Sequence, residues 1–147
     1  MICHIMKGIM MLKKKIKVYV SHYIRGPEGN KASKATIETN IANTKEICKQ
    51  LRIHFGSNLD LYVPAEMDEF PQIAMQEGYL DIDGVLDIDC IIVARCDALL
   101  LLDFKQNLSE GMVRELAAAE FAGLPFYTLE GMDEVSLEKL RNWLESL

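Results

Sequence analysis

The chain has 147 residues, of which 50% are hydrophobic, and a formal net charge of −6. This length fits one domain that is large enough to bury a core. The acidic balance argues against non-specific binding to the phosphate backbone of nucleic acids. No apolar run approaches the ~20 residues that a membrane-spanning helix needs, so we expect no membrane partner.

Residues 1–15 differ in character from the rest and are expected to be a poorly ordered leader, followed by a single domain over 16–147. In the leader the basic residues follow the apolar ones, which is the reverse of a signal peptide; they are Lys13, Lys14 and Lys15, with Lys17 close behind. The cysteines have no CxxC spacing, and three lie in apolar patterns typical of buried thiols: Cys48, Cys90 and Cys96. This usage favours a reducing, cytoplasmic location over a disulfide framework.

The first half of the domain predicts a strand, a loop, a helix and a second strand. Residues 16–21 are rich in β-branched and aromatic side chains, and a polar loop follows over 22–32. Ser33 can cap a helix that ends at Gly56, because apolar residues recur at steps of three or four. The residues on this face are Ile37, Ile41, Thr44, Cys48, Leu51 and Phe55. Residues 59–63 predict the second strand.

The second half begins with an irregular stretch over 64–80, which we expect to be a functional or mobile loop. A helix is predicted over 84–96, with an apolar face made of Val85, Ile88, Ile92 and Cys96. An apolar strand over 98–102 follows. Ser109 then starts a helix that runs to residue 122.

A fourth strand over 126–129 and a closing amphipathic helix over 136–147 complete the pattern. Strands that alternate with helices imply a parallel sheet covered on both faces. The sequence therefore predicts an α/β, flavodoxin-like, doubly wound parallel sheet of four to five strands. Ligands of such sheets lie beyond the carboxyl ends of the strands.

The turn after the 98–102 strand puts several polar residues at that edge. Glu115 lies about 100° around the helix from Leu116, which must pack on the sheet, so Glu115 can face the cleft. On helical spacing alone the favoured alternative is a solvated Glu115 side chain that pairs with a neighbouring Arg or Lys. Ser109 at the helix start can satisfy one backbone amide with its hydroxyl and leave the other free amides to bind an anion or a ligand hydroxyl. Gly111 in the first turn implies either close approach of a ligand or a tight packing contact.

The loop after the first strand is a second candidate for ligand binding. It combines Ser21, Tyr23, Arg25 and Gly26, and such a loop between strand and helix can cradle a phosphate or a sugar. It matches neither of the glycine-rich nucleotide motifs. His22 can serve as ligand or acid/base, although a histidine at a strand end is more often simply exposed.

The aspartate-rich stretch over 81–89 fails as a calcium loop, because Val85 stands where a ligand is needed and Gly84 comes too early. The histidines are scattered, and no HExxH or GxSxG motif occurs. We therefore expect no metal and no cofactor. Asp89 differs from the other acids because it lies on the helix that leads into the 98–102 strand.

Together these pieces resemble the nucleoside 2-deoxyribosyltransferase family, which includes the 2′-deoxynucleoside 5′-monophosphate N-glycosidases. The likeness covers residues 16 to about 129. It is carried by the strand and turn VYVSHYIRG, by Asp89 placed eight residues before Asp97 of the next strand, and by Ser109-x-Gly111-x-x-x-Glu115.

The resemblance implies cleavage or transfer of the N-glycosidic bond of a nucleoside or its 5′-monophosphate. In it Glu115 is the nucleophile and Asp89 protonates or orients the leaving base. Ser21, Tyr23, Arg25, Gly26, Ser109 and Gly111 would bind the substrate. It also implies a homodimer or higher homo-oligomer. The base, the 5′ group and the choice between transfer and hydrolysis stay open.

Two other functions compete with this one. A catalytically silent nucleotide sensor would use the same cradle, with Glu115 bonded to ribose hydroxyls. A response-regulator-like domain is disfavoured, because it needs paired acids after the first strand, where this chain has Ser21 and His22.

Overall fold

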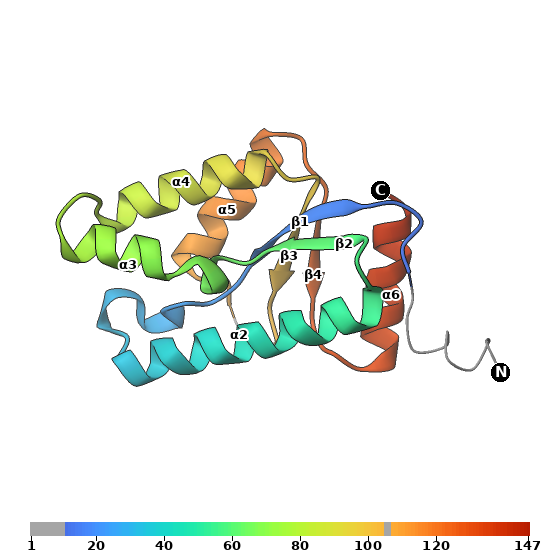
Figure 1. Ribbon diagram of the computed structural model, residues 1–147, viewed down its shortest axis with the longest axis horizontal. Coiled ribbons are helices and arrows are strands. Elements are labelled where there is room, and N and C mark those ends of the chain that lie inside the picture. Colours follow the sequence, from blue (N-terminus) through green and yellow to red (C-terminus); the bar gives the residue numbers. More distant parts are fainter. Residues whose placement is uncertain (1–10, 105–106) are drawn as a thin grey trace.

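The computed structural model describes residues 11–104 and 107–147 (Figure 1). Within these residues it is an α/β fold with one parallel sheet in the order β2-β1-β3-β4. The strands are β1 (Ile16–Ser21), β2 (Leu59–Tyr62), β3 (Ala98–Leu102) and β4 (Phe126–Leu129). The helices are α2 (Lys34–Phe55), α3 (Glu69–Gln76), α4 (Ile82–Ala94), α5 (Glu110–Phe121) and α6 (Glu134–Glu145). The predicted fold class is confirmed, with four strands in the described part.

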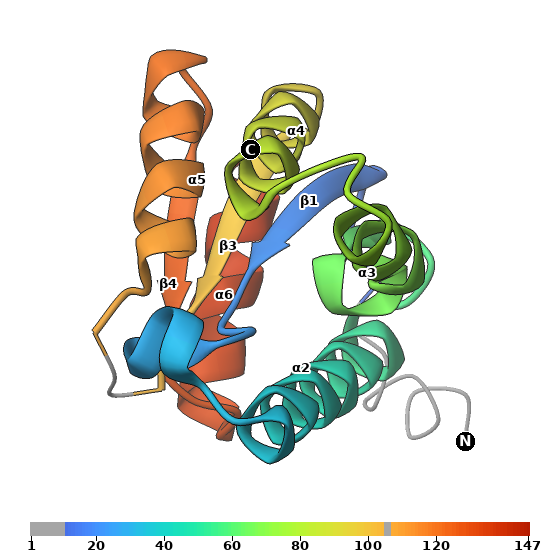
Figure 2. The same cartoon turned by 90° about the vertical axis from the view of Figure 1, so that its left-hand side faces the viewer.

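The helices cover both faces of the sheet (Figure 2). On one face α2 and α6 pack against alternate strand residues such as Val18 and Leu100. On the other face α4 and α5 pack against Tyr19, Leu99 and Leu101. Because side chains alternate along a strand, the all-apolar β3 serves both cores at once.

The leader expected over 1–15 falls only partly within the described residues, because residues 1–10 lie outside them. Leu12 is buried in the core beside α2 and α6. The Asn58 side chain donates a hydrogen bond of 2.6 Å to the Leu12 carbonyl oxygen. The end of the expected leader is therefore attached to the domain.

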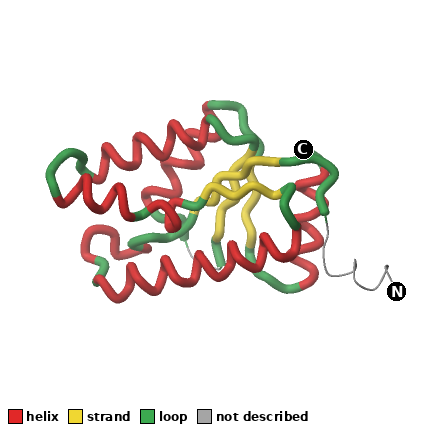
Figure 3. The backbone as a smooth tube through the Cα atoms, viewed as in Figure 1, coloured by secondary structure: helices red, strands yellow, loops and turns green. Residues whose placement is uncertain are grey.

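The expected loop over 64–80 is wrong, since most of it is helical (Figure 3). A short 3₁₀ helix, η3 (Pro64–Met67), leads into α3. Pro64 and Pro71 each lie in a first turn, where a missing N–H breaks no intrahelical bond. The first loop contains a similar turn, η2 (Gly26–Lys31).

The apolar face predicted for α4 is also partly wrong. Val93 is fully buried, whereas Ile88 is 44% exposed. The helix is apolar on nearly every side near its end, so spacing alone cannot select the packed face. Asp81 accepts a bond from the Gly84 amide and starts the helix two residues earlier than expected.

Candidate active site

A cavity of about 410 Å³ lies at the carboxyl edge of the sheet. Its walls come from the segment after β1, from η3 and α3, from α4, and from the first turns of α5. Six of the predicted site residues line it: Glu115, Asp89, Ser109, Gly111, Arg25 and Gly26. The segments predicted to meet at this edge therefore enclose one space.

Glu115 is the most deeply buried acid of the cavity, with 5% of its surface exposed. The Tyr19 hydroxyl donates a hydrogen bond to its Oε2, and the Ser21 hydroxyl donates one of 2.9 Å to its Oε1. The solvated alternative for Glu115 is thus wrong, because both carboxyl oxygens are held by β1. The side chain is fixed while still facing the cavity.

Tyr19 is a site residue that the sequence reasoning missed. Tyr19 and Ser21 are two apart on β1, so their side chains leave the strand on the same face. Tyr19 is fully buried and stacks on Tyr62 with ring centroids 5.5 Å apart. Burial, together with the charge of Glu115, raises the pKa of Tyr19, so its hydroxyl remains a donor. The signal available in the sequence was the spacing of Tyr19 and Ser21, two polar side chains two residues apart on a buried strand.

The charge state of Glu115 is set by opposing effects. Burial raises the pKa of Glu115 to about 7, the bonds from Tyr19 and Ser21 lower it, and the charge of Asp89 raises it. The carboxyl therefore titrates near neutral pH, where proton loss makes it a nucleophile.

Asp89 projects from α4 into the same cavity. Burial raises the pKa of Asp89 to about 6, and its charge acts on Glu115, Tyr19 and Tyr62. The two predicted carboxyls thus interact in one space, and each binds a proton more readily than an exposed carboxyl. Such a pair can divide the roles of nucleophile and acid.

Of the residues predicted to bind substrate in the first loop, Arg25 and Gly26 line the cavity. Gly26 has a φ of 72°, a left-handed conformation that favours glycine. The Asn40 side chain donates a bond of 3.0 Å to the Ile24 carbonyl and so ties this turn to α2.

Ser21 and Tyr23 do not line the cavity. Ser21 is fully buried beneath Glu115 and positions it. Tyr23 packs against the core on the α4 and α5 side, and among the described residues its buried hydroxyl has no hydrogen-bond partner.

Ser109 and Gly111 lie at the amino end of α5, on the cavity wall. The Ser109 hydroxyl accepts a bond of 3.2 Å from the Met112 amide, as predicted for a helix cap. A Cβ on Gly111 would lie 3.3 Å from Leu86 of α4. The tight packing contact expected as one explanation of Gly111 is therefore present, at a point that also faces the cavity.

His22 is buried, with 6% exposure, so the expectation of an exposed histidine is wrong. Its Nε2 accepts a bond of 3.2 Å from the Ala65 amide, and its Nδ1 donates one of 3.0 Å to the Tyr23 carbonyl. This pattern requires the neutral ring, and burial lowers the pKa of His22. His22 therefore fastens the end of β1 to η3.

Two of the remaining aspartates of α4 serve helix packing. Arg114 of α5 bonds to Asp83 at 2.9 Å and to Asp87 at 2.7 Å. In the described part of the chain no cluster of three or more potential ligands could hold a metal ion. None of the described helices is long and apolar enough to cross a membrane.

The raised pKa of Glu115 predicts how stability depends on pH. Between its ordinary value of 4.5 and about 7, the folded chain holds a proton that the unfolded chain releases. The free energy of unfolding therefore falls as pH rises through this window, by roughly 3 kcal/mol from Glu115 alone. Glu115→Gln removes this loss, so the variant should gain stability over the wild type as pH rises from 4.5 to 8.

Urea unfolding at several pH values measures this difference. The matched control is Glu120→Gln, an exposed position on the same helix, which should track the wild type. A stability difference between Glu115→Gln and the wild type that stays constant with pH would contradict the buried-charge account.

Comparison of the chain with protein-family models, with curated proteins and with solved structures found no match in any of the three.

Proposed function

We propose that this chain cleaves or transfers the N-glycosidic bond of a nucleoside or its 5′-monophosphate, through a covalent glycosyl intermediate on Glu115. The observation that carries the proposal is the buried Glu115 carboxyl, held at both oxygens by Tyr19 and Ser21 and facing a cavity that it shares with Asp89. The family resemblance of the sequence gives the reaction class.

In the first step a Glu115 oxygen attacks the anomeric carbon of the sugar. The bond from this carbon to the base nitrogen breaks, and its electron pair leaves with the base. The Asp89 carboxyl supplies the proton that the departing base takes up, because a protonated base is the better leaving group. The products are a glycosyl ester of Glu115 and a neutral base.

In the second step water or another base attacks the same anomeric carbon and restores the Glu115 carboxylate. Asp89, now ionised, takes the proton that the attacking group loses, so both carboxyls return to their starting state. Two displacements retain the configuration of the sugar. Water gives hydrolysis and a second base gives transfer.

The pKa values of the pair do not by themselves assign these roles. Asp89 has a pKa of about 6 and Glu115 about 7, so a single proton shared by the pair lies mainly on Glu115. Because the two charges interact, their protons come off in coupled steps. The reactive state, with Glu115 ionised and Asp89 protonated, is therefore the less populated of the two singly protonated states.

The first test measures base release from a panel of deoxynucleosides and their monophosphates, with and without an acceptor base. Glu115→Gln should abolish turnover while leaving binding largely intact, because the amide is nearly isosteric but a far weaker nucleophile. Asp89→Asn should slow the reaction by about 10²–10⁴-fold, and least for bases that leave easily. Trapping of a glycosyl ester on Glu115 by mass spectrometry would identify the intermediate.

Glu120→Gln is the matched control and should keep full activity. Tight binding without base release from any member of the panel would instead favour the sensor function.

A second prediction concerns the pH profile of the reaction. The bond from Tyr19 lowers the pKa of Glu115, so Tyr19→Phe should raise it. The alkaline limb of kcat/KM, which reports the higher pKa of the coupled pair, should then move to higher pH by about one unit. Tyr62→Phe, which alters the ring stacked on Tyr19, should leave that limb in place. Equal shifts in both variants would contradict this role of Tyr19.

We also propose a homo-oligomer in the cytoplasm. The buried thiols of Cys48 and Cys96 suit a reducing compartment, and α4 leaves Ile88 and Ile91 exposed. Sedimentation at several concentrations should give a mass of at least two chains. A monomer at every concentration would refute the oligomer.

A further inference from the structure

The walls of the cavity carry more acids than its chemistry needs. Beside Asp89 and Glu115, the lining includes Asp68, Asp83 and Glu110. Among the described residues, Arg25 supplies the single guanidinium or ammonium group of the lining. Asp83 is paired with Arg114, so the unbalanced charge rests mainly on Asp68 and Glu110.

Glu110 occupies the position at which a phosphate would be expected to bind. It is the first residue of α5, between the capping Ser109 and the closely packed Gly111. The amino end of a helix attracts anions through its amides and its dipole. Here the Ser109 hydroxyl already accepts a hydrogen bond from the Met112 amide. The Glu110 carboxylate supplies the negative charge that the helix end favours.

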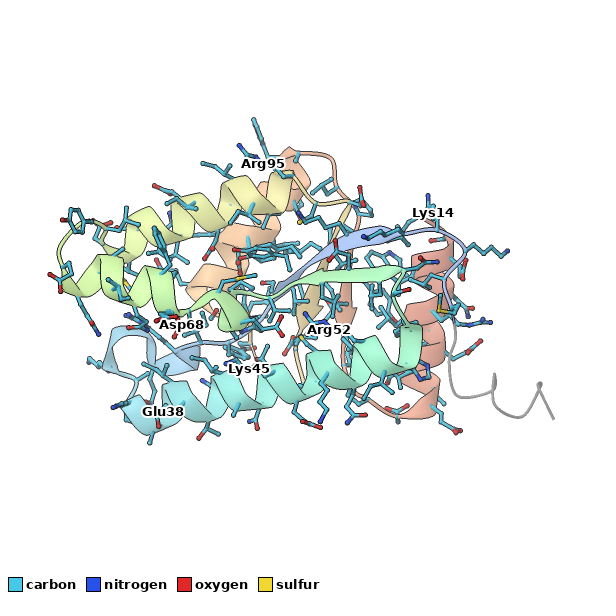
Figure 4. All side chains as sticks on the ribbon, in the orientation of Figure 1. Lys14, Glu38, Lys45, Arg52, Asp68 and Arg95 are labelled. Atoms are coloured by element: carbon cyan, nitrogen blue, oxygen red, sulfur yellow. The ribbon has the colours of Figure 1, made fainter. Side chains whose placement is uncertain are left out.

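Asp68 adds negative charge from another wall. It stands at the start of α3, where Figure 4 labels it, and it lines the cavity. The Gln72 amide donates a long bond of 3.5 Å to its Oδ2, and Asp68 forms no salt bridge with any of the described cations. Carboxylates on the α3 wall and on the α5 wall therefore line the space that a phosphate dianion would enter, and repulsion between like charges disfavours its binding.

We infer that the site takes an uncharged nucleoside in preference to its 5′-monophosphate, and that Glu110 is a specificity-determining residue. This inference rests on the proposed function, since it names the substrate class of the same site.

The test compares kcat/KM for base release from a deoxynucleoside and from its 5′-monophosphate. The nucleoside should be the better substrate by at least about tenfold at low ionic strength, because each like-charge contact is unfavourable. Added salt should reduce the ratio of the two kcat/KM values, because it screens the repulsion between the phosphate and the carboxylates. Glu110→Gln should raise kcat/KM for the monophosphate by about threefold or more, and Asp68→Asn should act in the same direction.

Glu120→Gln, farther along the exposed side of α5, is the matched control and should leave the ratio unchanged. A monophosphate that reacts as well as the nucleoside would overturn the inference, as would a ratio that Glu110→Gln does not alter.

Failure of the proposed function is distinguishable from failure of this inference. If no substrate releases its base, equilibrium binding of the same two ligands decides the question. The selectivity would be upheld in a non-catalytic site if the nucleoside binds more tightly and if salt and Glu110→Gln each reduce the difference in affinity between the two ligands. Equal or tighter binding of the monophosphate would overturn it.

Discussion

The rest of the site depends on the burial of one carboxyl against the central strand. Glu115 reaches from α5 to β1, where Tyr19 and Ser21 hold its two oxygens. Both donors come from alternate positions of one strand, so the sheet sets their spacing with little freedom. The stacked Tyr62 and the buried end of β1, fastened by His22 to η3, keep these donors in place. A nucleophile held in this way loses little orientational freedom when it reacts.

This arrangement costs stability, which argues for a functional rather than a structural role. Burial raises the pKa of Glu115 to about 7 despite two hydrogen bonds, so the bonds do not fully replace the lost hydration. A neutral residue of similar size would pack at the same place without that cost. Asp89 adds a second partly buried acid nearby, and its charge raises the pKa of Glu115 further. Two acids that disfavour each other's charge are typical of sites in which protonation states matter.

The sequence predicted the fold from local pattern, because alternating strands and helices fix the parallel sheet. Local pattern did not place Glu115: the angle between Leu116 and Glu115 only permits the carboxyl to face the cleft, spacing alone favoured a solvated side chain, and the family resemblance supplied the expectation of a site residue. The role of Tyr19 was not predicted, because on an apolar strand a tyrosine also fits the core. Helix α3 was missed because the stretch over 64–80, which contains Pro64 and Pro71, shows no regular pattern, although a proline in a first turn is compatible with a helix. Helix α4 is apolar on too many sides for spacing to choose its packed face.

The relative position of the two carboxyls is decided by a contact between helices rather than by the sheet. Asp89 belongs to α4 and Glu115 to α5, and these helices meet where Gly111 lets Leu86 approach closely. Arg114 then joins α5 to two turns of α4 through Asp83 and Asp87. A shift of one helix along the other would disturb these contacts and the carboxyl pair together. Gly111 and Arg114 therefore affect the chemistry by fixing the position of α5 relative to α4. Part of the short motif from Ser109 to Glu115 thus serves to pack these two helices together.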